Sequence, residues 1–357
     1  MNDNDLPLDD TIAPLVEIID FAMDKSTTIR DFLKMSGLQE ILDLEGLTEL
    51  AINEPYTVWF DRGNDWESKK LPLLDYKLCM DVAKTLAVFA GLTIPLGEGN
   101  PVASVILPDG ERGQVAVPPA TKTGIVSMTF RKPSTSRFTL EDYEKTGRFD
   151  KYQEMQLKSL ELTSTQQTLI ELKESGRITE FFKLAVTGYM NILLVGGTGS
   201  GKTTVMKAMV DCYPKESRLF TIEDVHELNL PNHPNHLNLF YKQGGLTPKQ
   251  IIESCMRMKP DHVLLAELRG DEAWTYLEML NTGHQGSITT IHANDCRSAP
   301  ARLAGLVKQS EVGQTLEMDH ILKTIKTSID VIAFFDKTQL TELYFNPVLK
   351  NKLLSEV

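Results

Sequence analysis

The sequence predicts an α/β protein of two domains, the second of which is built on a mainly parallel sheet. Its 357 residues suffice for two domains of about 150 residues each. Over residues 190–335, short apolar runs alternate with helix-length segments, and this pattern favours parallel strands with helices on both faces. The preceding part mixes helical patterns with short strands and turns, as antiparallel α+β domains do. We expect an N-terminal domain at 1–138, a linker at 139–155 and a larger domain at 156–357.

The N-terminal domain is expected to begin with helices and to continue with a small sheet. Apolar side chains recur at helical spacing over 14–23, and a second helical pattern covers 28–42. A turn-rich segment at 61–65 separates two strand-like runs and predicts a β-hairpin. In order, the expected elements are hairpin strands at 56–60 and 66–71, a helix at 76–89, and strands near 103–107, 112–117 and 124–130.

The larger domain is expected to alternate strands and helices after an opening helix. Ser164 and Gln167 have the spacing of a capping box, and Gly176 suits the end of that helix. His233 and His236 lie among prolines with no cysteine nearby, which indicates a polar surface loop rather than a zinc site. The expected strands are 191–195, 219–222, 262–266, 287–291 and 329–335.

Residues 196–203, Gly-Gly-Thr-Gly-Ser-Gly-Lys-Thr, satisfy the phosphate-loop motif G-x-x-x-x-G-K-[ST] and lie between a strand and a helix-compatible run. The glycines let backbone amides surround phosphate oxygens, and the helix N-terminus adds partial positive charge. We expect Lys202 to reach the β- and γ-phosphates and Thr203 to ligate Mg²⁺. The residues predicted to bind a nucleoside triphosphate are Gly197, Thr198, Gly199, Ser200, Gly201, Lys202, Thr203 and Thr204.

Polar residues follow three of the predicted strands, at the edge where open α/β sheets bind ligands. Glu223 and Asp224 follow 219–222, Glu267 follows the strand that ends at Ala266, and His292 follows Ile291. Phosphate transfer needs carboxylates that hold Mg²⁺ and orient water, and a polar group that senses the γ-phosphate. We predict that Glu267 is the general base or water-orienting residue, that Glu223 is catalytic, and that His292 contacts the γ-phosphate or the metal's waters. The predicted metal set is Thr203, Glu223, Asp224 and Glu267.

Composition excludes several classes of protein. A net charge of −12 argues against a general nucleic-acid binder, and no run of about 18 apolar residues is present to span a membrane. The acidic N-terminus lacks the apolar core of a secretory signal, and four widely spaced cysteines are expected to be reduced thiols of a cytoplasmic protein. No N/T-K-x-D guanine signature is present, which disfavours a GTPase.

Three successive motifs after the phosphate loop together resemble the secretion ATPase superfamily, most closely the hexameric traffic ATPases of bacterial type IV secretion systems. Residues 221–224 with Glu227 look like that family's Asp box, 257–269 like its Walker B region and 282–294 like its His box. In the first half, 110–120 and 131–134 resemble the family's N-terminal domain, and 138–143 resembles the start of its linker. Ala266 stands where glycine is common, and Lys259 where arginine is common.

The resemblance implies a RecA-like P-loop ATPase domain, ATP and Mg²⁺ as cofactors, and a homohexamer. It implies that the protein is peripheral at the cytoplasmic face of the inner membrane, where inner-membrane components of the secretion machine are its partners. ATP hydrolysis would power substrate translocation or pilus assembly. Arg112 and Arg131 would reach the nucleotide phosphates from the N-terminal domain, and Arg218 and Arg269 would also compensate charge.

Two alternatives remain open at the level of sequence. A P-loop motor acting on nucleic acid would show hydrolysis stimulated by DNA or RNA, although the acidic balance disfavours it. A nucleotide-gated scaffold, in this or another secretion or pilus system, would bind partners with negligible turnover. No sequence-specific nucleic-acid binding is expected.

Overall fold

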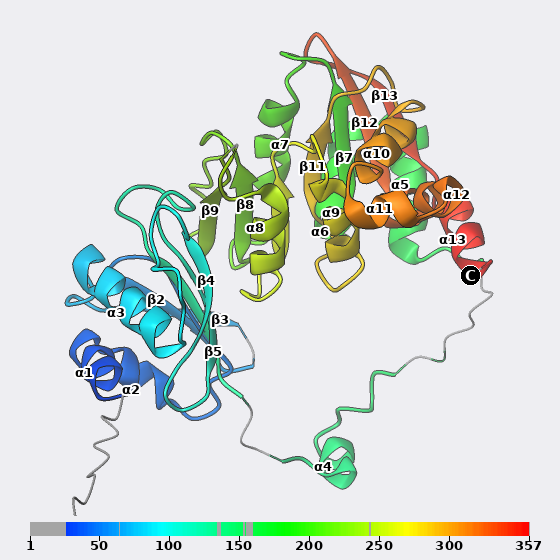
Figure 1. The fold of residues 1–357 in the computed structure, drawn as a ribbon. Coiled ribbons are helices and arrows are strands. Elements are labelled where there is room, and N and C mark those ends of the chain that lie inside the picture. Colours follow the sequence, from blue (N-terminus) through cyan, green and yellow to red (C-terminus); the bar gives the residue numbers. More distant parts are fainter. Residues whose placement is uncertain are drawn as a thin grey trace, which may run out of the picture.

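The chain folds around two separate sheets, which Figure 1 shows on the two sides of the molecule. The computed structural model describes residues 26–63, 65–133, 137–152, 154, 160–242 and 244–356. The helix expected at 14–23 lies outside these residues. None of the helices in the described ranges is long and apolar enough to cross a membrane.

The first sheet has six antiparallel strands in the order β3-β2-β1-β6-β5-β4. Helices α1, α2 and α3 cover one face of it, and apolar residues of these helices pack on the strands in one core. Its elements are α1 Thr27–Ser36, α2 Leu38–Leu42, β1 Glu49–Glu54, β2 Thr57–Asp61, β3 Trp66–Lys70, α3 Tyr76–Phe89, β4 Val102–Ile106, β5 Arg112–Ala116 and β6 Ser127–Arg131. The predicted antiparallel α+β domain is therefore confirmed.

Two features of this domain differ from the sequence prediction. The helix expected over 28–42 is divided at Gly37, whose φ of +78° ends α1 and begins α2. A left-handed residue stops a helix because its amide can no longer continue the ladder, and glycine adopts this conformation without a Cβ penalty. Strand β1 was not predicted, although it lies in the middle of the sheet between β2 and β6.

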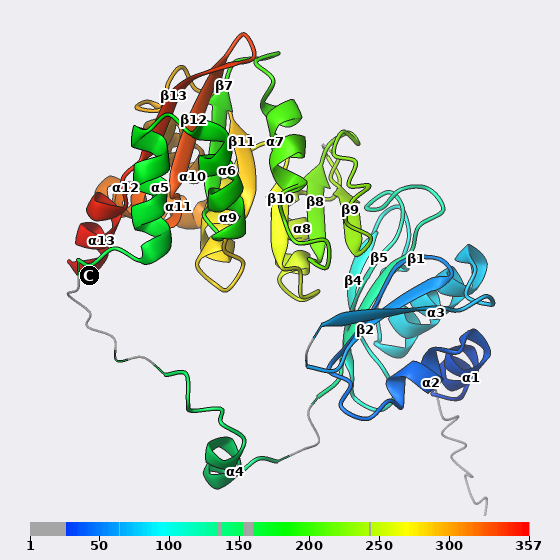
Figure 2. The ribbon, with the colours of Figure 1, turned by 180° about the vertical axis from the view of Figure 1, so that it is seen from behind.

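Between the two sheets, α4 (Leu140–Lys145) stands apart from both, as the opposite views of Figures 1 and 2 agree. The chain re-enters the larger domain at α5 (Ser164–Glu174), which a capping box does open. The box is one residue earlier than predicted, with Thr163 as N-cap and Gln166 as its partner.

The second sheet has seven strands in the order β13-β12-β7-β11-β10-β8-β9, and all neighbours are parallel except β12 and β13. Alternate residues of β7 explain the layers: Leu193 and Val195 join the core under α8, α9, α10 and α12, whereas Ile192 and Leu194 join the core under α5, α6 and α7. The remaining elements are α6 Ile178–Thr187, β7 Ile192–Gly196, α7 Lys202–Val210, β8 Leu219–Glu223, β9 His236–Phe240, α8 Pro248–Cys255, β10 His262–Leu265, α9 Glu272–Leu280, β11 Ile288–Ile291, α10 Ala299–Val307, α11 Glu311–Thr315, α12 Met318–Ser328, β12 Val331–Asp336, β13 Gln339–Phe345 and α13 Pro347–Ser355.

The polar surface loop predicted around His233 and His236 is correct for part of this segment, since 231–235 form a loop of turns and bends, and wrong for the two histidines. His236 begins strand β9, and His233 is fully buried, with its Nε2 at 3.2 Å from the carbonyl oxygen of Tyr213. Polar residues and prolines around the strand conceal it in the sequence, because its burial comes from pairing with β8 and from the first domain.

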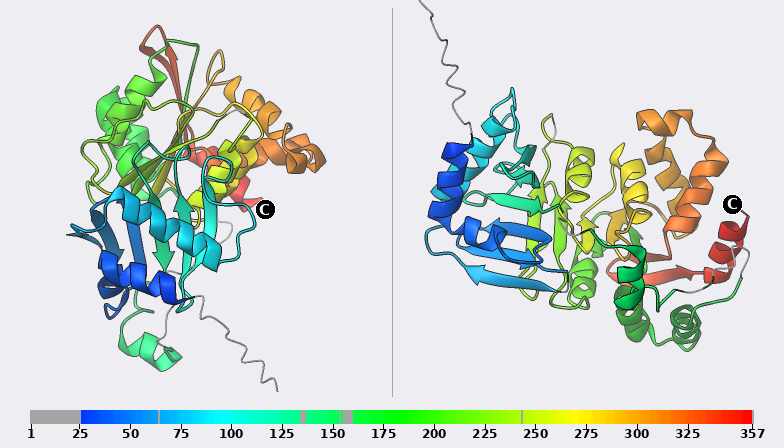
Figure 3. Two further views of the ribbon diagram at one scale, coloured as in Figure 1. Left: turned by 60° about the vertical axis from the view of Figure 1, so that its left-hand side comes forward. Right: turned by 90° about the horizontal axis from the view of Figure 1, so that it is seen from below.

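The two domains meet beside the β8–β9 edge of the second sheet, as Figures 1 and 3 show. Arg218, immediately before β8, is fully buried there, and its Nη1 donates to Asn53 Oδ1 (2.9 Å) and Asn235 Oδ1 (2.7 Å). Its Nη2 donates to Thr129 Oγ1 (3.1 Å). Nearby, Lys259 Nζ forms an ion pair with Asp61 Oδ2 at 2.6 Å. A lysine thus makes this contact between the domains at a position where arginine is common in the family.

Glu49 gives this interface a dependence on pH. Its carboxyl is buried, Arg131 Nε lies 3.6 Å from Oε1, and Oε2 has no hydrogen-bond partner among the described residues. Burial raises its pKa from 4.5 to about 7, against the opposing effect of Lys259 and Arg131. Between about pH 4.5 and pH 7, the Glu49 carboxyl of the folded protein therefore retains a proton that the same group releases in the unfolded chain.

We expect the free energy of unfolding to fall as the pH rises from 4.5 to 7, by on the order of 2 kcal/mol from Glu49 alone. Glu49→Gln should remove this component, because glutamine does not titrate. Urea unfolding of both proteins at pH 5 and pH 8 measures the difference. An equal pH dependence in the two proteins would show that Glu49 does not titrate in this range.

Candidate active site

The phosphate loop follows the carboxyl end of β7, in the middle of the second sheet. A Cβ at Gly196 would clash with the Phe335 carbonyl and the Ser200 hydroxyl, and Gly201 has a φ of +83° at the start of α7. The backbone amides of Gly201, Lys202 and Thr203 have no acceptor among the described residues. Unpaired amides at a helix N-terminus form an anion-binding site.

Lys202 is buried, and its ammonium donates to the carbonyl oxygens of Gly196 (2.8 Å) and Gly197 (2.9 Å). Burial lowers the pKa of this ammonium, and the nearby Glu267 carboxylate opposes that shift. The lysine is therefore held inside its own loop, within electrostatic reach of the acidic residue at the end of a neighbouring strand.

Glu267 follows β10 and lies close to His292, which follows β11. Its Oε1 is 2.8 Å from His292 Nε2, and only 13% of its side chain is exposed. The backbone on both sides of Glu267 is fixed to β11, because Thr290 Oγ1 donates to the Ala266 carbonyl and Leu268 N donates to the Thr290 carbonyl, each at 2.8 Å. The structure thus brings Lys202, Glu267 and His292 together at one sheet edge.

Arg269 extends this group toward β8. Its Nε and Nη2 lie 2.8 Å and 2.7 Å from Glu267 Oε2, and its Nη1 donates to Asp224 Oδ2 at 2.6 Å. From the sequence, Arg269 was predicted to compensate phosphate charge. Its position two residues after Glu267, with Asp224 at the neighbouring strand end, was the available signal for these contacts, and the phosphate role remains a prediction.

Glu223 is not the free carboxylate that the sequence suggested. It is fully buried at the end of β8, where Oε1 accepts from Thr221 Oγ1 and Oε2 accepts from the amides of Glu227 and Leu228, each at 2.7 Å. These hydrogen bonds stabilise the turn that follows β8. The catalytic and metal-binding roles of Glu223 remain predictions that would require these bonds to be exchanged.

The predicted metal ligands are not assembled into one cluster. Within the described ranges, no group of three or more His, Cys, Asp or Glu side chains is arranged to hold a metal ion. Thr203, however, lies in the first turn of α7 beside the unpaired amides. Mg²⁺ in phosphate-loop proteins takes few protein ligands and completes its shell with phosphate oxygens and water, and the hydroxyl of Thr203 fits as one of those few ligands.

Arg112 and Arg131 lie away from the phosphate loop of their own chain. They face each other across β5 and β6, and Arg131 lines a cavity of about 1330 Å³ with Asp261 and His262, at the start of β10. That is the amino edge of the second sheet, whereas the phosphate loop lies at its carboxyl edge. Within one chain the two arginines therefore do not contact a bound triphosphate.

Arg218 was expected to compensate phosphate charge, and this expectation is wrong. It precedes β8 at the amino edge of the sheet and all of its described partners belong to the domain interface. Burial lowers its pKa to about 9, which leaves it charged at neutral pH. The acidic motif five residues later misled the prediction, because that motif lies at the other end of the strand.

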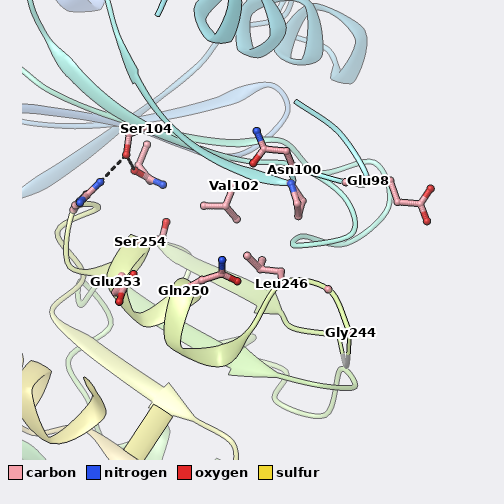
Figure 4. A pocket seen from close by; sticks show the side chains of 14 residues that line it. Glu98, Asn100, Val102, Ser104, Gly244, Leu246, Gln250, Glu253 and Ser254 are labelled. Carbon is pink, nitrogen blue, oxygen red and sulfur yellow. Dashed lines mark hydrogen bonds between the residues drawn. The ribbon is translucent and has the colours of Figure 1, made fainter. Parts of the chain in front are cut away.

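A second cavity, of about 530 Å³, also lies between the domains and is separate from the phosphate loop. Figure 4 shows Asn100, Val102 and Ser104 on one side of it and Leu246 and Gln250 on the other. Neither interdomain cavity includes residues 196–203.

Comparison with known proteins gives matches over most of the chain. The family model described as type II/IV secretion system protein matches residues 152–337. The type IV secretion system protein VirB11 of Brucella suis is 40% identical over 333 residues, covering 89% of this chain and 91% of that one. Protein VirB11 of Agrobacterium fabrum is 34% identical over 322 residues, covering 88% and 91%.

A solved structure is similar over almost the whole fold. It is the VirB11 ATPase from the Brucella suis type IV secretion system in complex with sulphate, with a TM-score of 0.84 at 39% identity, covering 91% of this chain and 99% of that one. Because both the motif-bearing domain and the full-length fold match, this chain belongs to the type II/IV secretion system protein family, as an ATPase of type IV secretion.

Proposed function

We propose that this chain hydrolyses Mg²⁺-bound ATP at residues 196–203, as one member of a homohexameric ring at the cytoplasmic face of the inner membrane. Turnover in that ring drives substrate translocation or pilus assembly through membrane-bound partners. The observation that carries the proposal is the convergence of Lys202, Glu267 and His292 beside the unpaired amides of the loop.

Each residue of the site has a separate role in this proposal. Amides at the start of α7 bind the phosphate oxygens, and Lys202 exchanges its two carbonyl acceptors for the β- and γ-phosphates. Thr203 would hold a Mg²⁺ ion, which would supply positive charge next to the phosphates. Glu267 accepts a proton from the attacking water or orients it, and His292 positions Glu267 and meets the γ-phosphate.

A ring explains the position of the two arginines of the first domain. Arg112 and Arg131 lie at the opposite edge from the phosphate loop of their own chain, and a γ-phosphate within their reach would belong to a neighbouring chain. An arginine supplied by a neighbour is worth about 10³–10⁵ in rate in phosphate-loop enzymes. Hydrolysis would then depend on ring assembly.

Glu267→Gln tests the chemistry. We expect turnover to fall by about 10²-fold or more while ATP affinity changes little, because the amide keeps the shape but cannot accept the proton of water. Steady-state hydrolysis and binding of a fluorescent ATP analogue separate the two effects.

Glu278→Gln is the matched control, since Glu278 is exposed on α9 and lies outside the site. Its turnover should equal that of the unmodified chain. Full activity in Glu267→Gln would remove Glu267 from the reaction, and a complete lack of Mg²⁺-dependent hydrolysis in the assembled, unmodified chain would contradict the proposed function.

A further inference from the structure

We propose that Thr290 is a positioning residue for Glu267, and that its side-chain hydroxyl keeps the Glu267 carboxylate beside Lys202 and His292. Thr290 is buried in β11, two residues before His292. The inference rests on the proposed function of the site, in which Glu267 accepts a proton from the attacking water or orients it.

Backbone pairing is sparse where β10 and β11 meet, in the middle of the second sheet (Figure 2). Strand β10 pairs with β8 from His262 to Leu265, and β11 pairs with β7 from Ile288 to Ile291, along the whole of each strand. Between β10 and β11, by contrast, the one register pair among the described residues joins Leu265 and Thr289. The position of β10 relative to β11 therefore depends on additional hydrogen bonds.

Buried hydroxyl groups make these additional bonds. At the amino end of the two strands, Ser287 Oγ accepts from the amide of Val263 at 3.1 Å. At the carboxyl end, Thr290 Oγ1 donates to the carbonyl oxygen of Ala266 at 2.8 Å, and Thr289 Oγ1 donates to the preceding carbonyl, also at 2.8 Å. All three hydroxyl-bearing residues are buried, so removing one of these hydroxyls leaves a backbone group without its partner.

The two oxygens of Thr290 fix the peptide groups on both sides of Glu267. Its Oγ1 bonds to the Ala266 carbonyl, which belongs to the peptide that enters Glu267. Its carbonyl oxygen accepts at 2.8 Å from the amide of Leu268, which belongs to the peptide that leaves Glu267. Because a peptide group is planar, holding both planes sets φ and ψ of the residue between them. Thr290 thus determines the direction in which the Glu267 side chain leaves the backbone.

These bonds join strands that carry different parts of the site. The phosphate loop follows β7, and His292 follows β11, which pairs with β7. Glu267 follows β10, which pairs with β8 on its other side. The placement of Glu267 relative to the loop is therefore set across the contact between β10 and β11. A shift of about 1 Å in a catalytic group can cost about 10²-fold in rate.

Thr290→Val tests the role of the hydroxyl, because valine has nearly the same shape but no donor. We expect kcat to fall by about tenfold with an unchanged KM for ATP, since Lys202 and the loop amides lie on the other side of this contact. Thr290→Ser keeps the hydroxyl and should stay within about twofold of the unmodified chain. Steady-state Mg²⁺-dependent hydrolysis by the full chain gives both constants, and far-UV circular dichroism checks the fold.

Ser287→Ala is the matched control. It removes a buried hydroxyl from the same contact between β10 and β11, but at the end opposite to Glu267. Both Ser287→Ala and Thr290→Val should lower the urea midpoint, whereas kcat should fall in Thr290→Val alone. An equal loss of kcat in the two variants would mean that the hydroxyls only stabilise the sheet, and would overturn the proposal.

A double-mutant cycle shows whether Thr290 acts through Glu267. In a Glu267→Gln background, Thr290→Val should have no further effect on the remaining rate. A further tenfold loss would show that Thr290 acts elsewhere, and a Thr290→Ser variant as slow as Thr290→Val would show that the hydroxyl is not the cause; either result would overturn the proposal.

Two further outcomes are distinguishable from these. If Thr290→Val does not fold, Thr290→Cys takes its place, because a thiol is a weak donor of similar size, and the same loss of kcat is expected. Absence of hydrolysis in the unmodified chain, by contrast, would refute the proposed function itself.

Discussion

Lys202→Ala should abolish ATP turnover, with an expected loss of at least about 10²-fold, and should leave the fold intact. The ammonium is the cation that approaches the β- and γ-phosphates in phosphate-loop enzymes, and alanine offers no donor in its place. The fold survives because the two bonds of Lys202 go to carbonyls of its own loop, not to the core. Phosphate release in the presence of Mg²⁺ measures turnover, and circular dichroism with thermal unfolding measures the fold.

Lys207→Ala is the control for this substitution, since Lys207 is an exposed lysine on the same helix, α7. It should retain the turnover of the unmodified chain. If Lys202→Ala keeps Mg²⁺-dependent ATPase activity, residues 196–203 are not the site of hydrolysis.

Arg218→Ala should destabilise the protein by about 3–5 kcal/mol, the range for breaking a buried charged network. The guanidinium is fully buried and serves acceptors on both domains, including Asn53 and Thr129 of the first domain and Asn235 of the second. It also lies over the rings of Trp66 and Phe220, at 4.9 Å and 4.8 Å from the centroids. Urea unfolding followed by tryptophan fluorescence measures the loss, because Trp66 reports on this interface.

The surface ion pair of Arg62 and Glu67 supplies the comparison. Its nitrogen–oxygen distance is 3.0 Å, but both side chains are about half exposed. Arg62→Ala should therefore cost no more than about 1 kcal/mol. Similar losses in the two variants would mean that Arg218 does not join the domains.

The prediction of the second domain rested on the periodicity of apolar residues and on the residues that follow each predicted strand. Apolar runs located β8, β10, β11 and β12 closely, because these strands are buried along nearly their whole length and are rich in apolar residues. The rule that ligands lie beyond the carboxyl ends of parallel strands then placed Glu267 and His292 at the same edge, where they do lie 2.8 Å apart. The family resemblance, which the comparisons confirm, rests on these same stretches.

The misplaced residues depend on side-chain contacts, some local and some between distant segments, that apolar periodicity does not describe. Arg218 and Arg269 are both arginines near acidic motifs, yet one bonds to the first domain and the other to Glu267. Glu223 looks like a free acid in sequence, but the turn after β8 folds its own amides onto the carboxylate. Strand β9 acquires its burial from neighbours rather than from its own composition. The periodicity of apolar residues does not encode these partners.

Strand β8 has a mechanical consequence. Arg218, buried in the contact with the first domain, precedes it directly, and Asp224 follows its last residue. Strands β9 and β10 pair with β8 on either side. The segment of about 20 Å from Arg218 to Asp224 is therefore held rigid by the sheet. A displacement of the first domain would therefore be transmitted along β8 to Asp224 and to its partner Arg269 at the other end of the strand.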